Sequence, residues 1–394
     1  MTILKLALKN LLGTGLRTWL NVFVLSLSFV LIIFTQGLLE GMNKQAEEAM
    51  IAAEVGGGHY QHPAYDPYDP LSLADAHGPV PAPLAALATS GQAAPVLVIQ
   101  GTIYPGGRLF TVRVKGIDPG QTVVDIPTSF LGAALAGDEI PVLIGNRMAK
   151  TTGLEKGDTF TLQWRDALGT FDARDAAVVE VMKTSVQTID SGQVWVPLAR
   201  LREMTGLAGE ATFAVLAQGA ALPAAGAAGG WVLRDSGYFL ADLRAMVESK
   251  TAGSSILYAI FLALAMLAIF DTQVLSIFHR RREMGTLMAL GFTRGKVIGL
   301  FTVEGMLNGV LAAVVAAAYG IPLLTWMART GWALPGDTDS YGFAIGERLF
   351  PSYGVGLVAG TTLVVLLTTT FVSFLPTRKI ANLKPTDALR GRMT

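Results

Sequence analysis

Residues 19–39, WLNVFVLSLSFVLIIFTQGLL, form an apolar run without a charged side chain, and this run decides the fold class. A helix needs about 20 apolar residues to cross the hydrocarbon core of a bilayer. Three further apolar runs follow at residues 251–278, 297–327 and 353–376, the first two of these with one acid each, and Pro322 is an expected kink in residues 297–327. Charged residues make up only 15% of the chain and hydrophobic residues 51%, which excludes an ordinary soluble protein. The sequence therefore predicts an α-helical membrane protein with four transmembrane helices.

The first run is predicted to be a retained membrane anchor that spans residues 18–40. A secretory signal peptide has an apolar region of about 7–15 residues, followed by a small-residue cleavage site. The run found here is longer, and no such site follows it before Glu40 and Gly41. A cleaved signal peptide is therefore the less favoured interpretation.

Lysine and arginine are placed unevenly around the four runs. These residues gather on the cytoplasmic side of membrane helices. Here they cluster before the first run, between the second and third and after the fourth, at Lys5, Lys9, Arg17, Arg280, Arg281, Arg282, Arg294, Lys296, Arg378, Lys379, Lys384, Arg390 and Arg392. Residues 41–250 and 328–352 instead carry more acids than bases. We therefore expect both termini and residues 279–296 to be cytoplasmic and the other two segments to lie outside. This sorting explains the basic clusters without a nucleic-acid partner.

Residues 41–250 are too many for a loop, and we expect them to form a large α+β extracytoplasmic domain between the first and second spans. Residues 42–53 and 237–250 are expected to continue the two adjacent membrane helices outward as a stalk. Two stretches favour short helices, residues 145–153 and 197–205. Runs typical of strands are separated by Gly- and Pro-containing turns, at residues 96–100, 110–115, 142–144, 159–164, 177–181 and 193–196.

Residues 279–296, HRRREMGTLMALGFTRGK, connect the second and third spans. Their centre favours a short helix, and Gly291 is a typical C-terminal stop. Met284, Leu287 and Met288 are spaced i, i+3 and i+4, so one side of this helix is apolar. Two interpretations fit this pattern. The segment is an amphipathic helix on the lipid surface, or it is a docking helix for a groove on a cytoplasmic partner.

Several motifs, in a fixed order along the chain, resemble the FtsX-like permease superfamily of ABC transporters. This superfamily includes lipoprotein-releasing permeases, MacB-type macrolide exporters and FtsX-type division proteins. The motifs are Leu6-Ala7-Leu8-Lys9-Asn10, Gly58-His59-Tyr60-Gln61, Arg282-Glu283-Met284-Gly285, Ala289-Leu290-Gly291, Glu304-Gly305, Leu375-Pro376-Thr377-Arg378-Lys379 and Leu383-Lys384-Pro385-Thr386-Asp387. The resemblance covers nearly the whole chain. It implies a cytoplasmic amphipathic helix at residues 1–17, a MacB-like periplasmic core domain at residues 41–250 and a cytoplasmic tail at residues 377–394, in a bacterial inner membrane.

The resemblance also implies a partner that hydrolyses ATP. The coupling residues that would seat on this partner are Arg282, Glu283, Met284, Gly285, Leu287, Met288, Ala289, Leu290 and Gly291. Two ATPase subunits and a second permease chain, identical or related, would complete the complex. ATP and magnesium would bind to the ATPase, and no cofactor to this chain. The sequence shows no phosphate-binding Walker A motif, since Gly291–Lys296 has too few intervening residues and Val297 in place of Ser or Thr. The chain is therefore predicted to be non-catalytic.

The favoured function is lipoprotein release from the inner membrane to a periplasmic carrier. MacB-type members carry a fused ATPase, which this sequence lacks, so the lipoprotein-release layout is the more similar one. MacB-type efflux and FtsX-type control of an outer-side partner are the alternatives. A membrane-bound ligand sensor is a more remote alternative, and it predicts no association with an ATPase.

Two acids lie inside the predicted spans, Asp271 and Glu304. Membrane acids are costly and often functional. A proton relay is conceivable, but a polar packing contact is the favoured interpretation. Gly305/Gly309 and Gly356/Gly360 have the spacing that allows helices to approach closely. Finally, a packing or surface role is favoured over a metal site for His59, His62, Asp66 and Asp69, because their spacing matches no standard ligand pattern.

Overall fold

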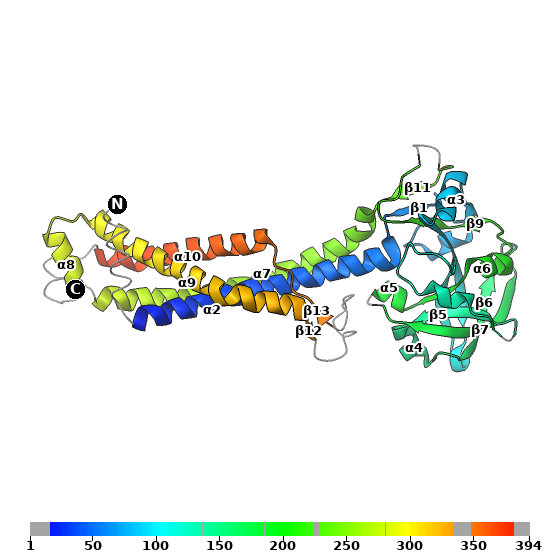
Figure 1. Ribbon diagram of the computed structural model, residues 1–394, viewed down its shortest axis with the longest axis horizontal. Helices are drawn as coiled ribbons and strands as arrows, with labels where there is room; N and C mark the ends of the chain where they lie inside the picture. The colour runs from blue at the N-terminus through cyan, green and yellow to red at the C-terminus, as the bar shows by residue number, and fades with distance from the viewer. Residues whose placement is uncertain are drawn as a thin grey trace. The chain divides into compact units, whose positions relative to one another are not determined.

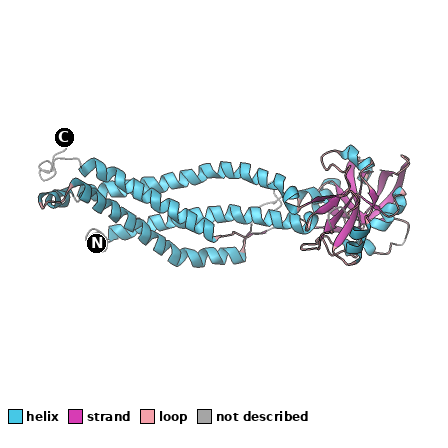
Figure 2. Ribbon diagram, turned by 90° about the horizontal axis from the view of Figure 1, so that it is seen from above, coloured by secondary structure: helices cyan, strands magenta, loops and turns pink. Residues whose placement is uncertain are grey.

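The computed structural model describes residues 16–135, 137–184, 186–223, 228–279, 281–333 and 348–381 (Figures 1 and 2). The chain divides into two compact units. The first, called the helical unit, comprises Met1–Asn43, Val247–Ala333 and Arg348–Thr394. The second, called the sheet unit, comprises Lys44–Met246 and Leu334–Glu347.

Long helices make up the helical unit: most of α2 (Leu16–Met50) and α7 (Ser236–His279), and all of α9 (Arg294–Thr330) and α10 (Val355–Ala381). The end of α2 after Asn43 and the start of α7 before Val247 belong to the sheet unit. Within the described residues, three stretches are long and apolar enough to cross a membrane: Val22–Val55, Arg294–Thr330 and Val355–Arg378. They cover the predicted first, third and fourth spans, and α9 continues as a helix through Pro322. The predicted second span, residues 251–278, lies within α7, and its membrane crossing stays a prediction.

Small residues let the helices of this unit approach one another closely. A Cβ atom placed on Gly309 of α9 would lie 3.2 Å from Leu366 and Thr369 of α10. One placed on Gly320 would lie 2.8 Å from Val30 of α2. In a membrane, packing of this kind stabilises helix association because lipid provides no hydrophobic driving force between helices. The shared core is apolar and contains Val22, Leu25, Phe29, Val30, Ile32, Ile33, Ala312, Ala316, Leu324 and Val365.

Nine strands form one sheet in the sheet unit, in the order β11-β1-β10-β3-β4-β8-β5-β7-β6. An additional pairing of β3 with β6 closes six of these strands into a ring. The ring strands are β3 (Ala93–Ile103), β4 (Phe110–Ile117), β5 (Ile140–Gly145), β6 (Thr159–Arg165), β7 (Phe171–Met182) and β8 (Gln193–Pro197). All six predicted strands are therefore confirmed, and they are the members of the ring.

Side chains that alternate along the ring strands fill its interior, as strand geometry requires. Leu97 and Ile99 of β3 enter one core, whereas Val96 and Val98 enter a second core on the other face of the sheet. The interior core includes Trp164, whose indole N–H donates to the Met204 carbonyl at 3.0 Å. Two helices pack near this core, α4 (Asn146–Thr152) and α6 (Leu198–Thr205), and both were predicted.

Three short strands extend the sheet beyond β3: β10 (Phe213–Leu216), β1 (His59–Gln61) and β11 (Val232–Arg234). All three pair in the antiparallel sense. Helix α3 (Ala82–Thr89) lies beside β3, and Leu84, Ala214 and Trp231 share a core there. Two-residue pairs complete the structure: β2 (Gly78–Pro79) with β9 (Glu210–Ala211), and β12 (Trp332–Ala333) with β13 (Arg348–Leu349).

Candidate functional site

The predicted coupling segment is helix α8, Arg281–Ala289 (Figure 1). It ends at Gly291, whose φ of +95° lies in the left-handed region that favours glycine. The Gly291 N–H donates to the Met288 carbonyl at 3.1 Å, and the Phe292 N–H donates to the Leu287 carbonyl at 3.0 Å. This pair of bonds is the Schellman motif, which satisfies the last carbonyls of a helix. The end of α8 is therefore fixed by its own sequence.

One face of α8 packs back onto α9. Met288 and Phe292 are partly buried against Val297 and Phe301, which are 0% and 2% exposed. Gly285, one turn before Met288, is also buried. These contacts anchor α8 to the start of a helix long enough to cross a membrane, so a force on α8 would be passed directly to α9.

The opposite face of α8 is open. Glu283, Thr286 and Leu290 are exposed and Leu287 is half-buried. These positions are spaced i, i+3, i+4 and i+7, which places them along one stripe of a helix. Leu290 is 75% exposed, although it is a large apolar side chain. Sequence reasoning missed Thr286, which the same spacing, counted from Glu283, could have found.

The predicted apolar side of Met284, Leu287 and Met288 stays a prediction, because the Met284 side chain is outside the described part. Met288 contacts α9, and Leu287 lies on the open stripe, because the nearest large apolar neighbours of α8 are at the start of α9. Ala289 is exposed. Arg280 lies outside the described residues, and the side chains of Arg282 and Met284 are outside the described part, so their roles stay predictions.

The two acids of the predicted spans lie in different surroundings. Asp271 of α7 is exposed, whereas Glu304 of α9 is 7% exposed. Glu304 is followed by Gly305, which is also buried. Burial of an acid among membrane helices fits an internal polar contact, the favoured interpretation for Glu304.

The two glycine pairs also differ. Gly305 and Gly309 are both buried in α9, and Gly309 meets α10. Gly356 and Gly360 are exposed, and a Cβ atom at either would meet nothing within 4 Å. The first pair is therefore used for packing within the chain.

Three of the four residues weighed as metal ligands, His59, Asp66 and Asp69, have local structural roles. The Asp66 carboxylate accepts from the Tyr68 N–H, and the Asp69 carboxylate accepts from the Leu71 N–H, both at 2.9 Å. His59 is buried in β1 at 3% exposure. Among the described residues, no group of three or more His, Asp or Glu side chains is placed to hold a metal ion.

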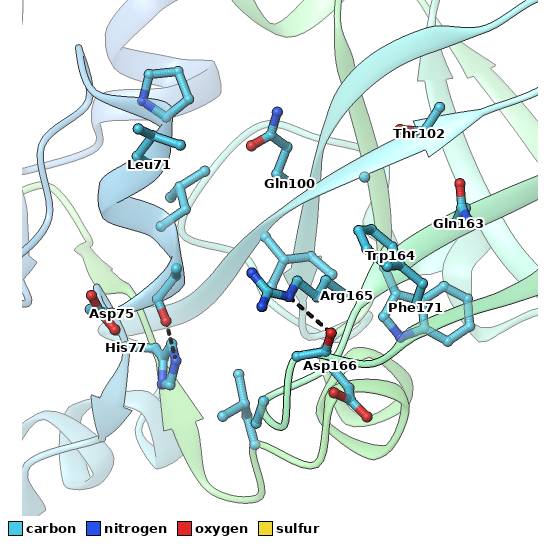
Figure 3. Close-up of a pocket in the computed structure, with 18 of the residues that line it drawn as sticks. Leu71, Asp75, His77, Gln100, Thr102, Gln163, Trp164, Arg165, Asp166 and Phe171 are labelled. Carbon is cyan, nitrogen blue, oxygen red and sulfur yellow. Dashed lines mark hydrogen bonds between the residues drawn. The ribbon is translucent and has the colours of Figure 1, made fainter.

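A hollow of about 630 Å³ lies in the sheet unit beside β3 and the β6–β7 hairpin (Figure 3). Gln100, Thr102 and Gln163 line it with hydrogen-bonding groups. Three exposed apolar side chains also line it: Leu71 at 80%, Leu168 at 92% and Phe171 at 70% exposure. Asp166 and Arg165 are used within the hairpin turn, where Arg165 donates to the Gly169 carbonyl and Asp166 accepts from the Leu168 N–H. This mixture suits contact with another polypeptide or an amphiphile better than it suits catalysis.

Two domain profiles match the chain. The MacB-like periplasmic core domain matches residues 18–228, which is more than half of the chain. The FtsX-like permease C-terminal domain matches residues 255–385 and so includes α8, α9 and α10.

The chain is also similar to individual proteins. It is 28% identical over 137 residues to an uncharacterised ABC transporter permease of Methanocaldococcus jannaschii, covering 34% of this chain and 31% of that protein. It is 27% identical over 158 residues to the macrolide export ATP-binding/permease protein MacB of Chromobacterium violaceum, covering 39% and 22%. MacB of Neisseria gonorrhoeae is 24% identical over 152 residues, covering 38% and 21%. The chain thus spans a third or less of the length of these relatives.

Proposed function

Since this chain belongs to the FtsX-like superfamily of ABC transporter permeases, we propose that it is a non-catalytic membrane subunit that couples ATP hydrolysis by a separate subunit to movement of its outer domain. In this proposal four helices cross a bacterial inner membrane, with both termini and α8 in the cytoplasm and the sheet unit outside. Two ATPase subunits carry ATP and magnesium, and a second permease chain, identical or related, completes the complex.

The open stripe of α8 is the observation that carries this proposal. Leu290, a large apolar side chain directly after this short helix, is 75% exposed, which suits insertion into a groove of a partner. The opposite face of the helix is anchored on α9 through Met288 and Phe292. A helix that packs on its own chain with one face and exposes the other can bind a partner and transmit the movement of that partner to α9.

The proposed cargo is a lipoprotein that leaves the membrane for an outside carrier. The similarity of Gly58-His59-Tyr60-Gln61 to lipoprotein-releasing permeases supports this choice. The hollow of the sheet unit offers a surface where such a cargo or carrier could bind. The second candidate is export driven by the same movement, which is favoured by the names of the MacB relatives. Identification by mass spectrometry of the lipid or protein bound to the purified complex separates the two.

The coupling role is tested by Leu290→Asp. The complex is purified through a tag on this chain, and the associated ATPase is identified and assayed. We expect the charge on the open stripe to weaken ATPase association by at least about tenfold, as hot-spot residues do, and to abolish stimulation of ATP hydrolysis. Met288 is left unchanged, because a substitution there would also disturb α9.

The matched control is Leu109→Asp, an exposed leucine of the sheet unit. It makes the same chemical change, and it should leave both ATPase association and ATP turnover unchanged. If Leu290→Asp retains the ATPase and its stimulation as the control does, α8 is not the docking element.

A further inference from the structure

The segment after α2 makes an unusually close approach to the sheet. Helix α2 is followed by a five-residue π-helix, Ile51–Val55, and then by three glycines that lead into β1. A Cβ atom on Gly56, Gly57 or Gly58 would lie 2.4–2.6 Å from the carbonyl oxygen of Leu216, Ala217 or Arg234. These oxygens belong to the backbone and cannot yield, so each of the three positions requires glycine.

The π-helix carries one half of a buried ion pair. The Lys115 ammonium group of β4 donates to the Glu54 carboxylate at 2.8 Å, and the two side chains are 5% and 20% exposed. The same ammonium group lies 4.9 Å from the centre of the Trp195 ring in β8, within the range of a cation–π contact. A buried pair of this kind resists separation, because either charge left alone in the interior would be costly.

His59 joins the ends of two helices. Its Nε2 lies 2.9 Å from the Glu54 carbonyl oxygen, and because a carbonyl only accepts, Nε2 must carry the proton. Its ring stacks on Phe213 at 4.8 Å and contacts Phe239, near the start of α7, at 4.3 Å. His59 of β1 therefore contacts the continuation of α2 and the first turn of α7 at once.

A further contact ties α7 to α2 in the same region. The Arg244 guanidinium group donates to both oxygens of the Glu47 carboxylate, at 3.0 and 3.2 Å. Tyr68, from the loop after β1, also donates to the Asp242 carboxylate of α7. Side-chain contacts thus connect α7 both to α2 and to the loop that follows β1 of the sheet.

From these contacts, which all lie within the sheet unit, we infer that residues 51–61, with Lys115, form a rigid joint that holds the last turn of α2 and the first turns of α7 in a fixed position on the sheet. Glu54, His59 and Lys115 are its positioning residues. This inference deepens the proposed function, and it assigns a physical role to the Gly-His-Tyr-Gln motif. The glycines allow residues 56–58 to approach the neighbouring backbone closely. The Glu54–Lys115 ion pair and the contacts of His59 restrict movement of this segment relative to the sheet.

The test measures stiffness in the full-length chain alone, without an ATPase. The native sequence has no cysteine, so spin labels attach only where cysteine is introduced. One label pair is Glu48→Cys on α2 with Glu203→Cys on α6, and the second is Ala241→Cys on α7 with Glu203→Cys. All three positions are exposed. Distances are measured by pulsed electron spin resonance.

We expect one narrow distance distribution for each pair in the otherwise native chain. Glu54→Gln with Lys115→Met removes both charges at similar volume, and His59→Phe keeps the ring but removes the hydrogen bond to Glu54. Both variants should lose the narrow distribution for both label pairs. The control is Asp190→Asn, which disrupts another buried ion pair of the sheet unit, to Arg147, and should keep it.

Narrow distributions in the folded His59→Phe chain and in the double variant would overturn the joint. A broadened distribution in Asp190→Asn would do the same, because it would show a general loss of stability. Failure of the proposed function looks different. A chain that binds no ATPase, yet shows the expected broadening, would leave the joint standing and remove the transporter assignment.

Discussion

His59 is kept neutral by its surroundings. Its pKa is lowered from 6.5 to about 4, chiefly by burial and also by the charge of nearby Lys115, although the hydrogen bond to the Glu54 carbonyl and the Glu54 charge act in the opposite direction. Its Nδ1 is buried and has no hydrogen-bond partner in the described structure. The neutral His59 ring therefore packs as an aromatic side chain that donates one hydrogen bond. A second proton would place a positive charge between Phe213 and Phe239.

This protonation state predicts how stability depends on pH. In the unfolded chain His59 binds a proton near pH 6.5, whereas in the folded chain it binds one only near pH 4. The unfolded state therefore gains protons first as pH falls. The contribution of neutral His59 is complete above pH 6.5 and decreases toward pH 4, by up to about 3 kcal/mol from a shift of this size.

The measurement compares thermal unfolding of the native chain and His59→Phe in detergent from pH 7.5 to pH 4. We expect the native chain to lose more of its melting temperature than the variant over this interval, because phenylalanine takes up no proton. Equal losses in the two proteins would show that the pKa of His59 is the same in the folded and unfolded chains.

Among the elements, α8 shows what a helix pattern does and does not determine. Its helix-forming residues and the glycine stop at Gly291 were readable from the sequence, and the Schellman bonds agree. The pattern did not reveal which apolar side chain is used internally. Met288 and Leu287 are adjacent, chemically alike and both partly buried, and only the position of Phe301 on α9 decides that Met288 is the one that packs against that helix.

Glycines of the helical unit lead to a prediction about element packing. A Cβ atom on Gly41 of α2 would lie 2.1 Å from the Phe350 carbonyl oxygen and 2.8 Å from the Pro351 Cα atom. Both are backbone atoms, so Gly41→Ala must displace the segment before α10. We expect a loss of about 1–3 kcal/mol in stability, the usual cost of overpacking.

Gly356→Ala is the matched control, since a Cβ atom at Gly356 of α10 meets nothing within 4 Å. The melting temperature of each variant in detergent gives the comparison. Gly41→Ala should melt well below the native chain and Gly356→Ala close to it. Similar melting of the two variants would show that α2 does not contact the residues before α10.

For the whole molecule, the sequence was most informative where patterns are local. The six strands of the ring were all predicted, because each is a short run of residues typical of strands that is bounded by turns. The three strands β1, β10 and β11 were missed, since they have only three or four residues and are held in place by the rest of the sheet. The joint could not be predicted from the sequence either, because its residues are distant in sequence. Glu54 and Lys115 are 61 positions apart in sequence and meet only through the fold.

The number of membrane crossings is a property of the whole chain and decides the side on which α8 lies. Leu109 of the sheet unit and Leu290 after α8 are both exposed, at 62% and 75%, and α7 lies between them in sequence. If α7 crosses the membrane, these positions are on opposite sides. If it does not, they are on the same side, and an ATPase in the cytoplasm could not reach α8 while the sheet unit is outside.

Single cysteines at the two positions test this arrangement, because the native chain has none. In cells whose outer membrane has been made permeable while the inner membrane stays closed, a membrane-impermeant maleimide should label Leu109→Cys and leave Leu290→Cys unlabelled. After the inner membrane is opened, both should react. Labelling of Leu290→Cys while the inner membrane is closed would place α8 outside, where no ATP-hydrolysing partner could bind it. The positive residues around α8 argue for the first result, since lysine and arginine next to membrane helices are retained in the cytoplasm.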